Sequence, residues 1–147
     1  MYGCQSMTSK ELINRARELQ SVGWNCRTDE RNTIRPHSGH ETIKHLHVKA
    51  EICRQAKAEG HTYWTEVAHG DASTDADYAD VLIARESQKN GVVVEVETGL
   101  TKERKREKVN QYLTDYIQEV LVIDPTNAPD SLDGLSKWVE NHLDGFV

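Results

Sequence analysis

Two glutamates lie inside a run of strand-forming residues. In GVVVEVETG, residues 91–99, Glu95 and Glu97 are one residue apart, so in a strand they point to the same side. Two ionised carboxylates cannot be buried there without partners, so this side either faces water or holds a cation. Asp80, in ADVLI, opens the preceding expected strand, and a hairpin between the two strands would bring it close to the pair. Such a cluster of three carboxylates is a hard oxygen site suited to Mg²⁺ or Mn²⁺.

Basic residues that could contact a polyanion occur in two segments. The segment KERKREK, residues 102–108, follows the carboxylates, and its cations could meet a nucleic-acid backbone: Lys102, Arg104, Lys105, Arg106 and Lys108. Arg27, Arg31 and Arg35 recur in an aperiodic segment nearer the N-terminus and are further candidates for backbone contacts. Contacts to phosphate carry no sequence information, so base-specific recognition does not follow from either segment.

The same residues also have a purely structural explanation. Alternating valine and glutamate is typical of a strand with one face in water. The charges of residues 102–108 could form a solvated helix face, with Glu103 and Glu107 as ion-pair partners. Asp80 before one apolar strand, and the basic segment after the other, favour the metal site.

Periodicity and turn residues indicate which elements must position these side chains. Helices are expected at 8–23, 41–58, 101–117 and 131–143, and strands at 61–69, 78–84, 92–97 and 119–124. Short turn-like segments join the first three strands, which can form an antiparallel meander, and the third helix supplies a crossover to the fourth strand. The predicted fold class is α/β, a mixed sheet with helices packed on it.

Apolar spacing predicts which helix faces are buried. On the helix at 41–58 the expected stripe consists of Ile43, Leu46, Ala50 and Cys53, widened by Val48, Ile52 and Ala56. On the helix at 101–117, Val109, Leu113 and Tyr116 are expected to face inward.

The acidic motifs and the order of the elements resemble the PD-(D/E)XK, or restriction-endonuclease-like, nuclease superfamily. The matching parts are ADV at 79–81, VEVE at 94–97 and the core order αβββαβ, over roughly residues 41–124. The resemblance implies that Asp80 and Glu95 bind the metal and that Glu97 assists as a ligand or base. Most members carry lysine at the position of Glu97, so the positive charge that handles the water and the phosphate must come from another element.

A narrower resemblance, to the nuclease domains of competence protein CoiA-like sequences, covers the helix before the first strand. In ETIKHLHVK, residues 41–49, Glu41, His45 and Lys49 match the Glu…His…Lys pattern of those domains. This similarity implies that Lys49 stabilises phosphate charge and that His45 orients Lys49 or contacts DNA. Lys102 and Lys105 are rival lysines, and a surface network of salt bridges on the helix is the structural alternative.

Three further interpretations concern single residues or the histidines. Arg106 and Tyr112 meet a loose Arg…Tyr pattern of the later helix, with Tyr112 expected to serve packing. Glu66 is either a structural partner or an additional metal ligand. Histidines near residue 40 invite a zinc interpretation, but HETIKH is one residue too long for the helical two-histidine motif and no paired cysteines occur. The sequence has no glycine-rich phosphate loop.

Composition and charge narrow the class of protein. The 147 residues carry a net charge of -6, which argues against a generic polycation that coats DNA, and three cysteines without a pairing framework favour a reducing compartment. No apolar run reaches the length of a membrane span, so we expect a cytoplasmic protein without a membrane partner. The expected division is an N-terminal helix and basic linker at 1–39 and a nuclease-like domain at 40–147, which ends in a C-terminal helix.

The resulting hypothesis is a metal-dependent nuclease, an endonuclease that hydrolyses phosphodiester bonds, with DNA favoured over RNA as substrate. The alternative is a non-catalytic module on the same fold that binds nucleic acid or serves in assembly. A homodimer is compatible with either.

Overall fold

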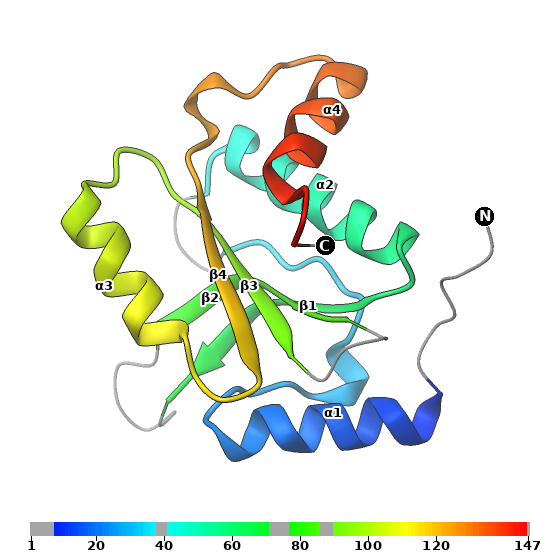
Figure 1. The fold of residues 1–147 in the computed structure, drawn as a ribbon. Coiled ribbons are helices and arrows are strands. Elements are labelled where there is room, and N and C mark those ends of the chain that lie inside the picture. Colours follow the sequence, from blue (N-terminus) through cyan, green and yellow to red (C-terminus); the bar gives the residue numbers. More distant parts are fainter. Residues whose placement is uncertain (1–7, 38–40, 71–76, 86–89, 147) are drawn as a thin grey trace.

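Four strands form one mixed sheet in the computed structural model, which describes residues 8–37, 41–70, 77–85 and 90–146 (Figure 1). In the order of the sheet they are β1 (Thr62–His69), β2 (Asp77–Ala84), β3 (Gly91–Val96) and β4 (Ile117–Ile123). The first three pair antiparallel, whereas β4 runs parallel to β3 after a crossover through helix α3 (Lys102–Tyr112). The predicted meander, crossover and α/β class are confirmed.

Two pairs of helices cover the two faces of the sheet (Figure 1). Helices α2 (Ile43–Ala58) and α4 (Leu132–Leu143) bury their apolar side chains on one face. Helix α1 (Ser9–Ser21) and the end of α3 pack on the other, together with Trp24. Two short 3₁₀ turns, η1 (Thr28–Glu30) and η2 (Pro125–Asn127), lie in the connections.

Each of the four α-helices in the described ranges begins at a hydroxyl residue that caps it. Thr8, Thr42, Thr101 and Ser131 each accept a hydrogen bond from the backbone N–H three residues later. Thr42 and Thr101 set where α2 and α3 start, and therefore where His45 and Lys108 lie relative to the ends of the strands.

The N-terminal segment covers the outer edge of β1. Asn25 donates its backbone N–H to Ala68 O at 2.9 Å, and Asn32 donates to Tyr63 O at 2.7 Å. Arg35 N donates to Thr65 Oγ1 at 2.8 Å. The first two bonds occupy backbone carbonyls that an edge strand would otherwise leave open to another chain.

The regular alternation of side chains breaks in β1 and β2 at the same level of the sheet. Trp64 and Val67 pack in one hydrophobic cluster although they are three residues apart, and Ala79 and Leu82 do the same. Glu66, between the first two, has φ +49°, a left-handed conformation that costs a residue other than glycine about 1–3 kcal/mol. The break changes which way the acids at this level can point.

The buried faces of two helices differ from the sequence expectation. On α2, Val48, Ile52, Cys53 and Ala56 are buried, but Ile43 is 67% exposed, because the first turn of the helix extends beyond the sheet. Helix α3 ends at Tyr112 rather than continuing to 117. Tyr112 is therefore the buried residue at its C-terminal end, and Leu113 is 49% exposed. Val109 and Tyr116 are partly buried against the same cluster, as expected.

Two further features concern the pairing of the cysteines and the length and character of the helices. Cys26 and Cys53 are buried free thiols, and Cys4 lies outside the described residues. Across the described residues, no helix combines the length and the apolar character that a membrane crossing requires.

The corrected face of α2 predicts a contrast between two isoleucines on the same helix. Ile52→Ala should lower the free energy of unfolding by about 2–5 kcal/mol, because Ile52 has no exposed surface and its removal leaves a cavity. Ile43→Ala, the matched control with the same change in helix propensity, should alter it by less than about 0.5 kcal/mol. Denaturant unfolding of both variants measures the difference, and equal effects would contradict the assignment of the buried face.

Candidate functional site

An open pocket of about 420 Å³ lies where the start of β2 and the end of β3 meet the first turn of α2. Its ionisable lining comes from five separate parts of the chain and comprises His37, Glu41, His45, Asp80, Glu95, Glu97 and Lys108. The two strands that meet here carry the predicted metal ligands, and all three of them, Asp80, Glu95 and Glu97, line the pocket.

The pocket opens where β2 leaves β3. Their ladder ends at the pair Val81 and Val94, and the next residue back in β2 is Asp80. Beyond this point the backbone of Val96 is bound by side chains instead: its N–H donates to Asp80 Oδ2 at 2.7 Å, and its carbonyl accepts from His45 Nε2 at 2.7 Å. Asp80 and His45 thus replace the missing ladder hydrogen bonds.

Asp80 and Glu95 face each other across the end of this ladder as a buried pair. The two carboxyl groups are close enough to shift each other's pKa. Burial and the nearby charge of Asp80 raise the pKa of Glu95 well above its ordinary value. Burial would also raise the pKa of Asp80, but its contacts with His45, Glu95 and the Val96 N–H outweigh burial and lower the pKa. Glu95 therefore holds the proton and Asp80 the charge.

The donor set of this pair fits a hard divalent cation. Glu95 Oε1 is buried without a hydrogen-bond partner, and a cation bound between the two carboxyl groups would engage it. In the described ranges, no three His, Cys, Asp or Glu side chains already converge as a set of metal ligands. A site with two carboxylates still suits Mg²⁺, which keeps several waters and commonly binds one or two carboxylates together with a substrate phosphate.

Glu97, the third predicted ligand, lies at the rim beside a lysine. Its carboxylate accepts from Lys108 Nζ at 2.9 Å, and the same ammonium lies 3.9 Å from Glu95 Oε2 and 5.9 Å from the centre of the Tyr112 ring. Lys108 is thus the lysine beside the carboxylates, a role that the sequence argument did not assign to it. Its spacing of four from the buried Tyr112 was the available signal, because both then lie on one face of the helix.

His45 and Glu41 extend the pocket network onto α2. The ring of His45 contacts the carboxylate of Glu41 through Nδ1, and its Nε2 lies 3.5 Å from Asp80 Oδ1. Burial alone would lower the pKa of His45, but the hydrogen bonds and charges of Asp80 and Glu41 raise it to about 9. His45 is therefore protonated at neutral pH and holds the two carboxylates in place.

Lys49 is buried, so it cannot make the predicted contact with a phosphate. Its side chain has no exposed surface, and its ammonium lies 2.9 Å from Glu41 Oε2, 2.7 Å from Arg35 O and 3.7 Å from Glu66 Oε2. Four residues after His45 on α2, it points into the protein below the pocket. Lys49 balances the charge of Glu41, and Lys108 is the lysine that reaches the pocket.

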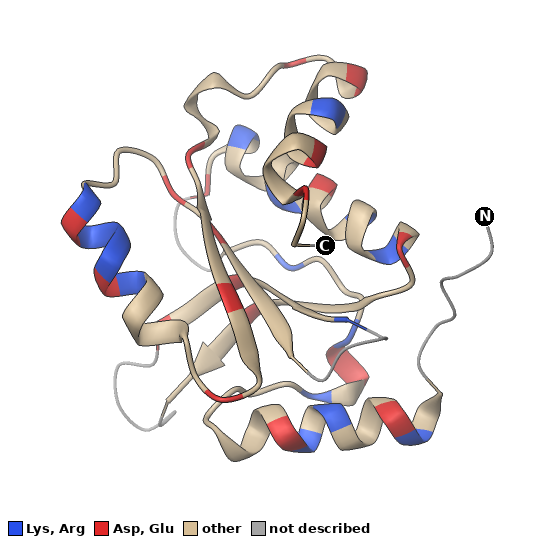
Figure 2. Ribbon diagram, in the orientation of Figure 1, with Lys and Arg blue, Asp and Glu red and all other residues tan. Residues whose placement is uncertain are grey.

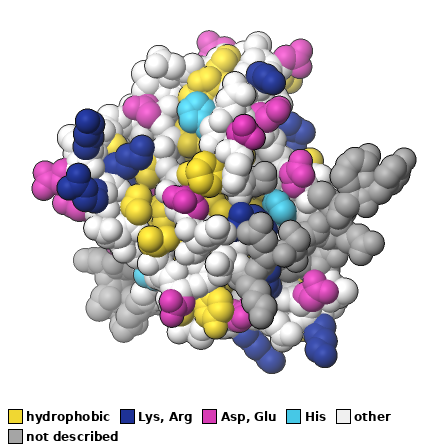
Figure 3. Space-filling view, in the orientation of Figure 1, with side chains coloured by type: hydrophobic (Ala, Val, Ile, Leu, Met, Phe, Trp, Pro, Cys, Tyr) yellow, Lys and Arg dark blue, Asp and Glu magenta, His cyan; other side chains and the backbone are white. Residues whose placement is uncertain are grey.

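The predicted nucleic-acid-binding residues fall into two separate regions. Lys102, Arg104, Lys105 and Arg106 are exposed on α3, interleaved with Glu103 and Glu107 (Figures 2 and 3). The three N-terminal arginines lie along the covered edge of β1 and not in the pocket. Arg27 pairs with Asp29, Arg31 donates to Thr28 O, and Arg35 donates to the carbonyls of Thr65 and Glu66.

Two secondary candidates have clear positions. Tyr112 is buried against Trp24 and His69, so it packs beneath the pocket, in line with the packing role expected for it. The Glu66 carboxylate meets His37 Nδ1 at 2.6 Å and the Lys49 ammonium, as expected of a structural partner. Burial raises the pKa of Glu66. His37 is one of the histidines near residue 40, and no local pattern in the sequence connects it with Glu66, 29 residues later.

The buried ion pair predicts a strong stability effect at Glu41. Glu41→Gln should destabilise the protein by about 3–5 kcal/mol, because it leaves the buried Lys49 without its closest carboxylate. Glu107→Gln, in an exposed pair with Arg104, is the control and should cost less than about 1 kcal/mol. In a double-mutant cycle, Lys49→Met should recover part of the Glu41→Gln loss, and strict additivity would argue against the pair.

The raised pKa of His45 predicts a pH-dependent contribution to stability. Since the pKa is about 9 in the folded protein and ~6.5 in the unfolded chain, the contribution is complete below pH ~6.5 and disappears as pH rises through 9. The difference in unfolding free energy between the wild type and His45→Gln should thus shrink by on the order of 2–3 kcal/mol across this window. Urea titrations from pH 6 to 10 measure it, and a constant difference would contradict the assignment.

Comparison with known proteins gives no match. The scan against protein-family models, the search of curated proteins and the search of solved structures each returned none for this chain. The function of the pocket is therefore inferred from its own residues.

Proposed function

We propose that this protein is a metal-dependent nuclease that hydrolyses phosphodiester bonds of nucleic acid, with DNA as the favoured substrate. The observation that carries the proposal is the buried pair of Asp80 and Glu95 in an open pocket, with Glu95 Oε1 lacking a hydrogen-bond partner. A structural role alone gives no reason to bury two neighbouring carboxyl groups that repel each other when both are ionised. A cation held between them would remove this repulsion.

Asp80 and Glu95 would hold the cation, Mg²⁺ or Mn²⁺, with Glu97 at the rim as a third oxygen donor. When bound, such an ion polarises a phosphoryl oxygen and lowers the pKa of a bound water. Protonated His45 keeps Asp80 in place through its ring and fixes the end of β3 through the Val96 carbonyl. The pair is thus held before substrate arrives, which lowers the reorganisation needed for catalysis.

Lys108 supplies the positive charge that the sequence lacks at position 97. Its ammonium extends from α3 to the acids of the pocket, where it can exchange its contact with Glu97 for a substrate phosphate. The exposed cations of α3 would continue this contact along the nucleic-acid backbone: Lys102, Arg104, Lys105 and Arg106. Arg104 already pairs with Glu107, so its contribution is reduced.

The order and pairing of the elements support the narrower assignment to the restriction-endonuclease-like fold. The core runs α2, β1, β2, β3, α3, β4, the αβββαβ order of that superfamily, with α1 added before it and α4 after it. The acids also lie at the two strand positions that the PD-(D/E)XK resemblance implies. Buried, unpaired thiols at Cys26 and Cys53 suit a reducing, cytoplasmic compartment.

A non-catalytic nucleic-acid-binding or assembly module is the alternative. The net charge of -6 and the contact of Lys108 with Glu97 favour it, since both weaken attraction for a phosphate. The two functions differ in what happens after binding, and a cleavage assay separates them.

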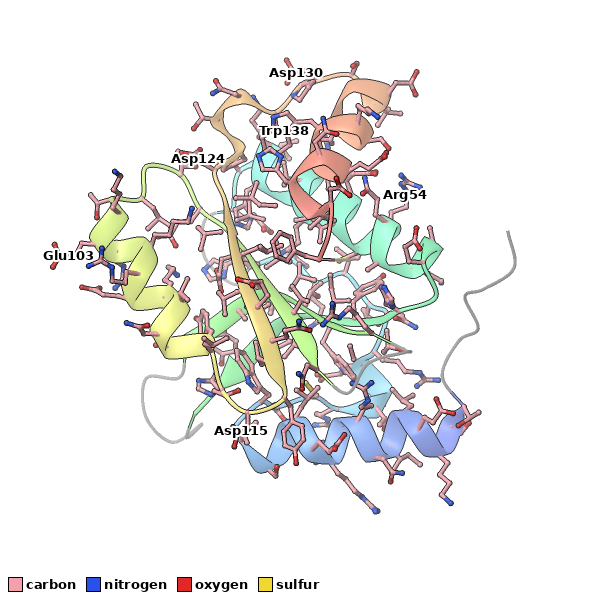
Figure 4. The ribbon with its side chains drawn as sticks, viewed as in Figure 1. Arg54, Glu103, Asp115, Asp124, Asp130 and Trp138 are labelled. Atoms are coloured by element: carbon pink, nitrogen blue, oxygen red, sulfur yellow. The ribbon has the colours of Figure 1, made fainter. Side chains whose placement is uncertain are left out.

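The proposal predicts metal-dependent cleavage that is lost on neutralising either acid of the pair. Wild-type protein should cut single- or double-stranded DNA with Mg²⁺ or Mn²⁺, and Asp80→Asn or Glu95→Gln should lower the rate on the order of 10²-fold or more. Glu103→Gln is the matched control, because Glu103 points away from the sheet at the outer end of α3 (Figure 4) and should change little.

A thermal measurement tests the cation separately from catalysis. Mn²⁺ should raise the melting temperature of the wild type and of Glu103→Gln but not of Asp80→Asn, because only a folded acid pair binds it. DNA binding without cleavage would support the non-catalytic module. Equal residual cleavage in the wild type and both acid variants would point to a contaminating nuclease.

A further inference from the structure

A second histidine in the pocket is held by a carboxylate that the proposed metal site does not use. His37 lines the same pocket as Asp80 and Glu95, and its side chain is 47% exposed. Its Nδ1 lies 2.6 Å from Glu66 Oε1, and the Glu66 side chain is only 10% exposed. With Nδ1–H donated to the carboxylate, Nε2 keeps its lone pair and can accept a proton.

The backbone is arranged to make this pair. Glu66 occupies a left-handed conformation within β1, φ +49°, where the regular alternation of the strand is lost. Such a conformation persists only where the surrounding structure over-determines it. Here the carbonyls of Thr65 and Glu66 both accept from Arg35, and the Lys49 ammonium lies 3.7 Å from Glu66 Oε2.

His37 is also fixed through its main chain. Its N–H donates to Glu41 Oε1 at 2.9 Å, and the other oxygen of Glu41 contacts His45 and Lys49. Two glutamates with largely covered side chains, Glu41 and Glu66, therefore hold one half-exposed imidazole from two directions. An ordinary surface ion pair between histidine and glutamate would not require a strained strand residue and a second buried anchor.

We propose that His37 is the proton-accepting catalytic residue of this site and that Glu66 is the residue that positions it. The inference rests on the proposed nuclease function. His37 Nε2 takes a proton from a water molecule as the water oxygen bonds to phosphorus. The bond from phosphorus to the leaving oxygen breaks, and that oxygen takes a proton from solvent. His37 then returns its proton to solvent, so one water is consumed and one phosphate end and one hydroxyl end are formed.

Single-turnover cleavage of DNA by full-length variants tests the role of His37. His37→Ala and His37→Gln should each cut about 10²-fold or more slowly than the wild type, the range expected for general-base catalysis. Added imidazole should restore part of the activity of His37→Ala, which a merely structural role would not allow. His47→Ala is the matched control, because His47 is an exposed histidine of α2 outside this pocket and should cut at the wild-type rate.

Two further measurements separate chemistry from binding and folding. The Mn²⁺-induced rise in melting temperature and the affinity for DNA should stay within about twofold of wild type in both His37 variants. Glu66→Gln should slow cleavage in the wild-type background but add nothing to His37→Ala, because Glu66 acts only through His37.

The outcomes distinguish this inference from the function on which it rests. Wild-type rates in His37→Gln, or no response of His37→Ala to imidazole, would overturn the role of His37 and leave the nuclease intact. An additive loss in Glu66→Gln with His37→Ala would overturn the positioning role of Glu66. No cleavage by the wild type under any metal condition would remove both proposals.

Discussion

The backbone of Val96 must find hydrogen-bond partners at the point where β2 separates from β3. A buried N–H or carbonyl without a partner is costly, so the end of a ladder inside a protein requires side chains that take over. Asp80 and His45 do so here, one from β2 and one from α2. The acid that completes the backbone of β3 is therefore the acid that faces Glu95, and the pocket exists because the two strands no longer pair.

The charged side chains around the end of the β2–β3 ladder form a chain of contacts, in which each one depends on its neighbour. Asp80 stays ionised because His45 is protonated, and His45 stays protonated because Asp80 and, on its other nitrogen, Glu41 both contact it. Glu41 is in turn balanced by the buried Lys49. Each charged group is paired with an opposite charge. Without such a partner, a buried ionisable group would lose its charge by gaining or releasing a proton. Polar networks of this kind are rigid only when every member is satisfied, so the loss of one residue should disturb several others.

The sequence supported the strands and the acids better than the basic residues. Hydrophobic runs bounded by turn residues located all four described strands, and strand periodicity with a hairpin was enough to bring Asp80 to Glu95. The lysines were harder because long side chains reach in directions that spacing does not determine. Lys49 was expected at the phosphate but lies under Glu41, whereas Lys108 reaches the pocket because α3 ends at Tyr112 and turns that face inward.

The contact between His37 and Glu66 shows a different limit of sequence reasoning. In the sequence, Glu66 is an ordinary residue of an expected strand, and no neighbouring residue indicates the left-handed conformation that it adopts. In the folded protein the N-terminal segment covers β1, Arg35 binds the carbonyls of Thr65 and Glu66, and Lys49 approaches the Glu66 side chain; these contacts hold the conformation. The same segment delivers His37 to the pocket. The strained residue and the histidine it holds are thus consequences of one packing event, the covering of an edge strand, and the edge that might have bound another chain instead completes the site.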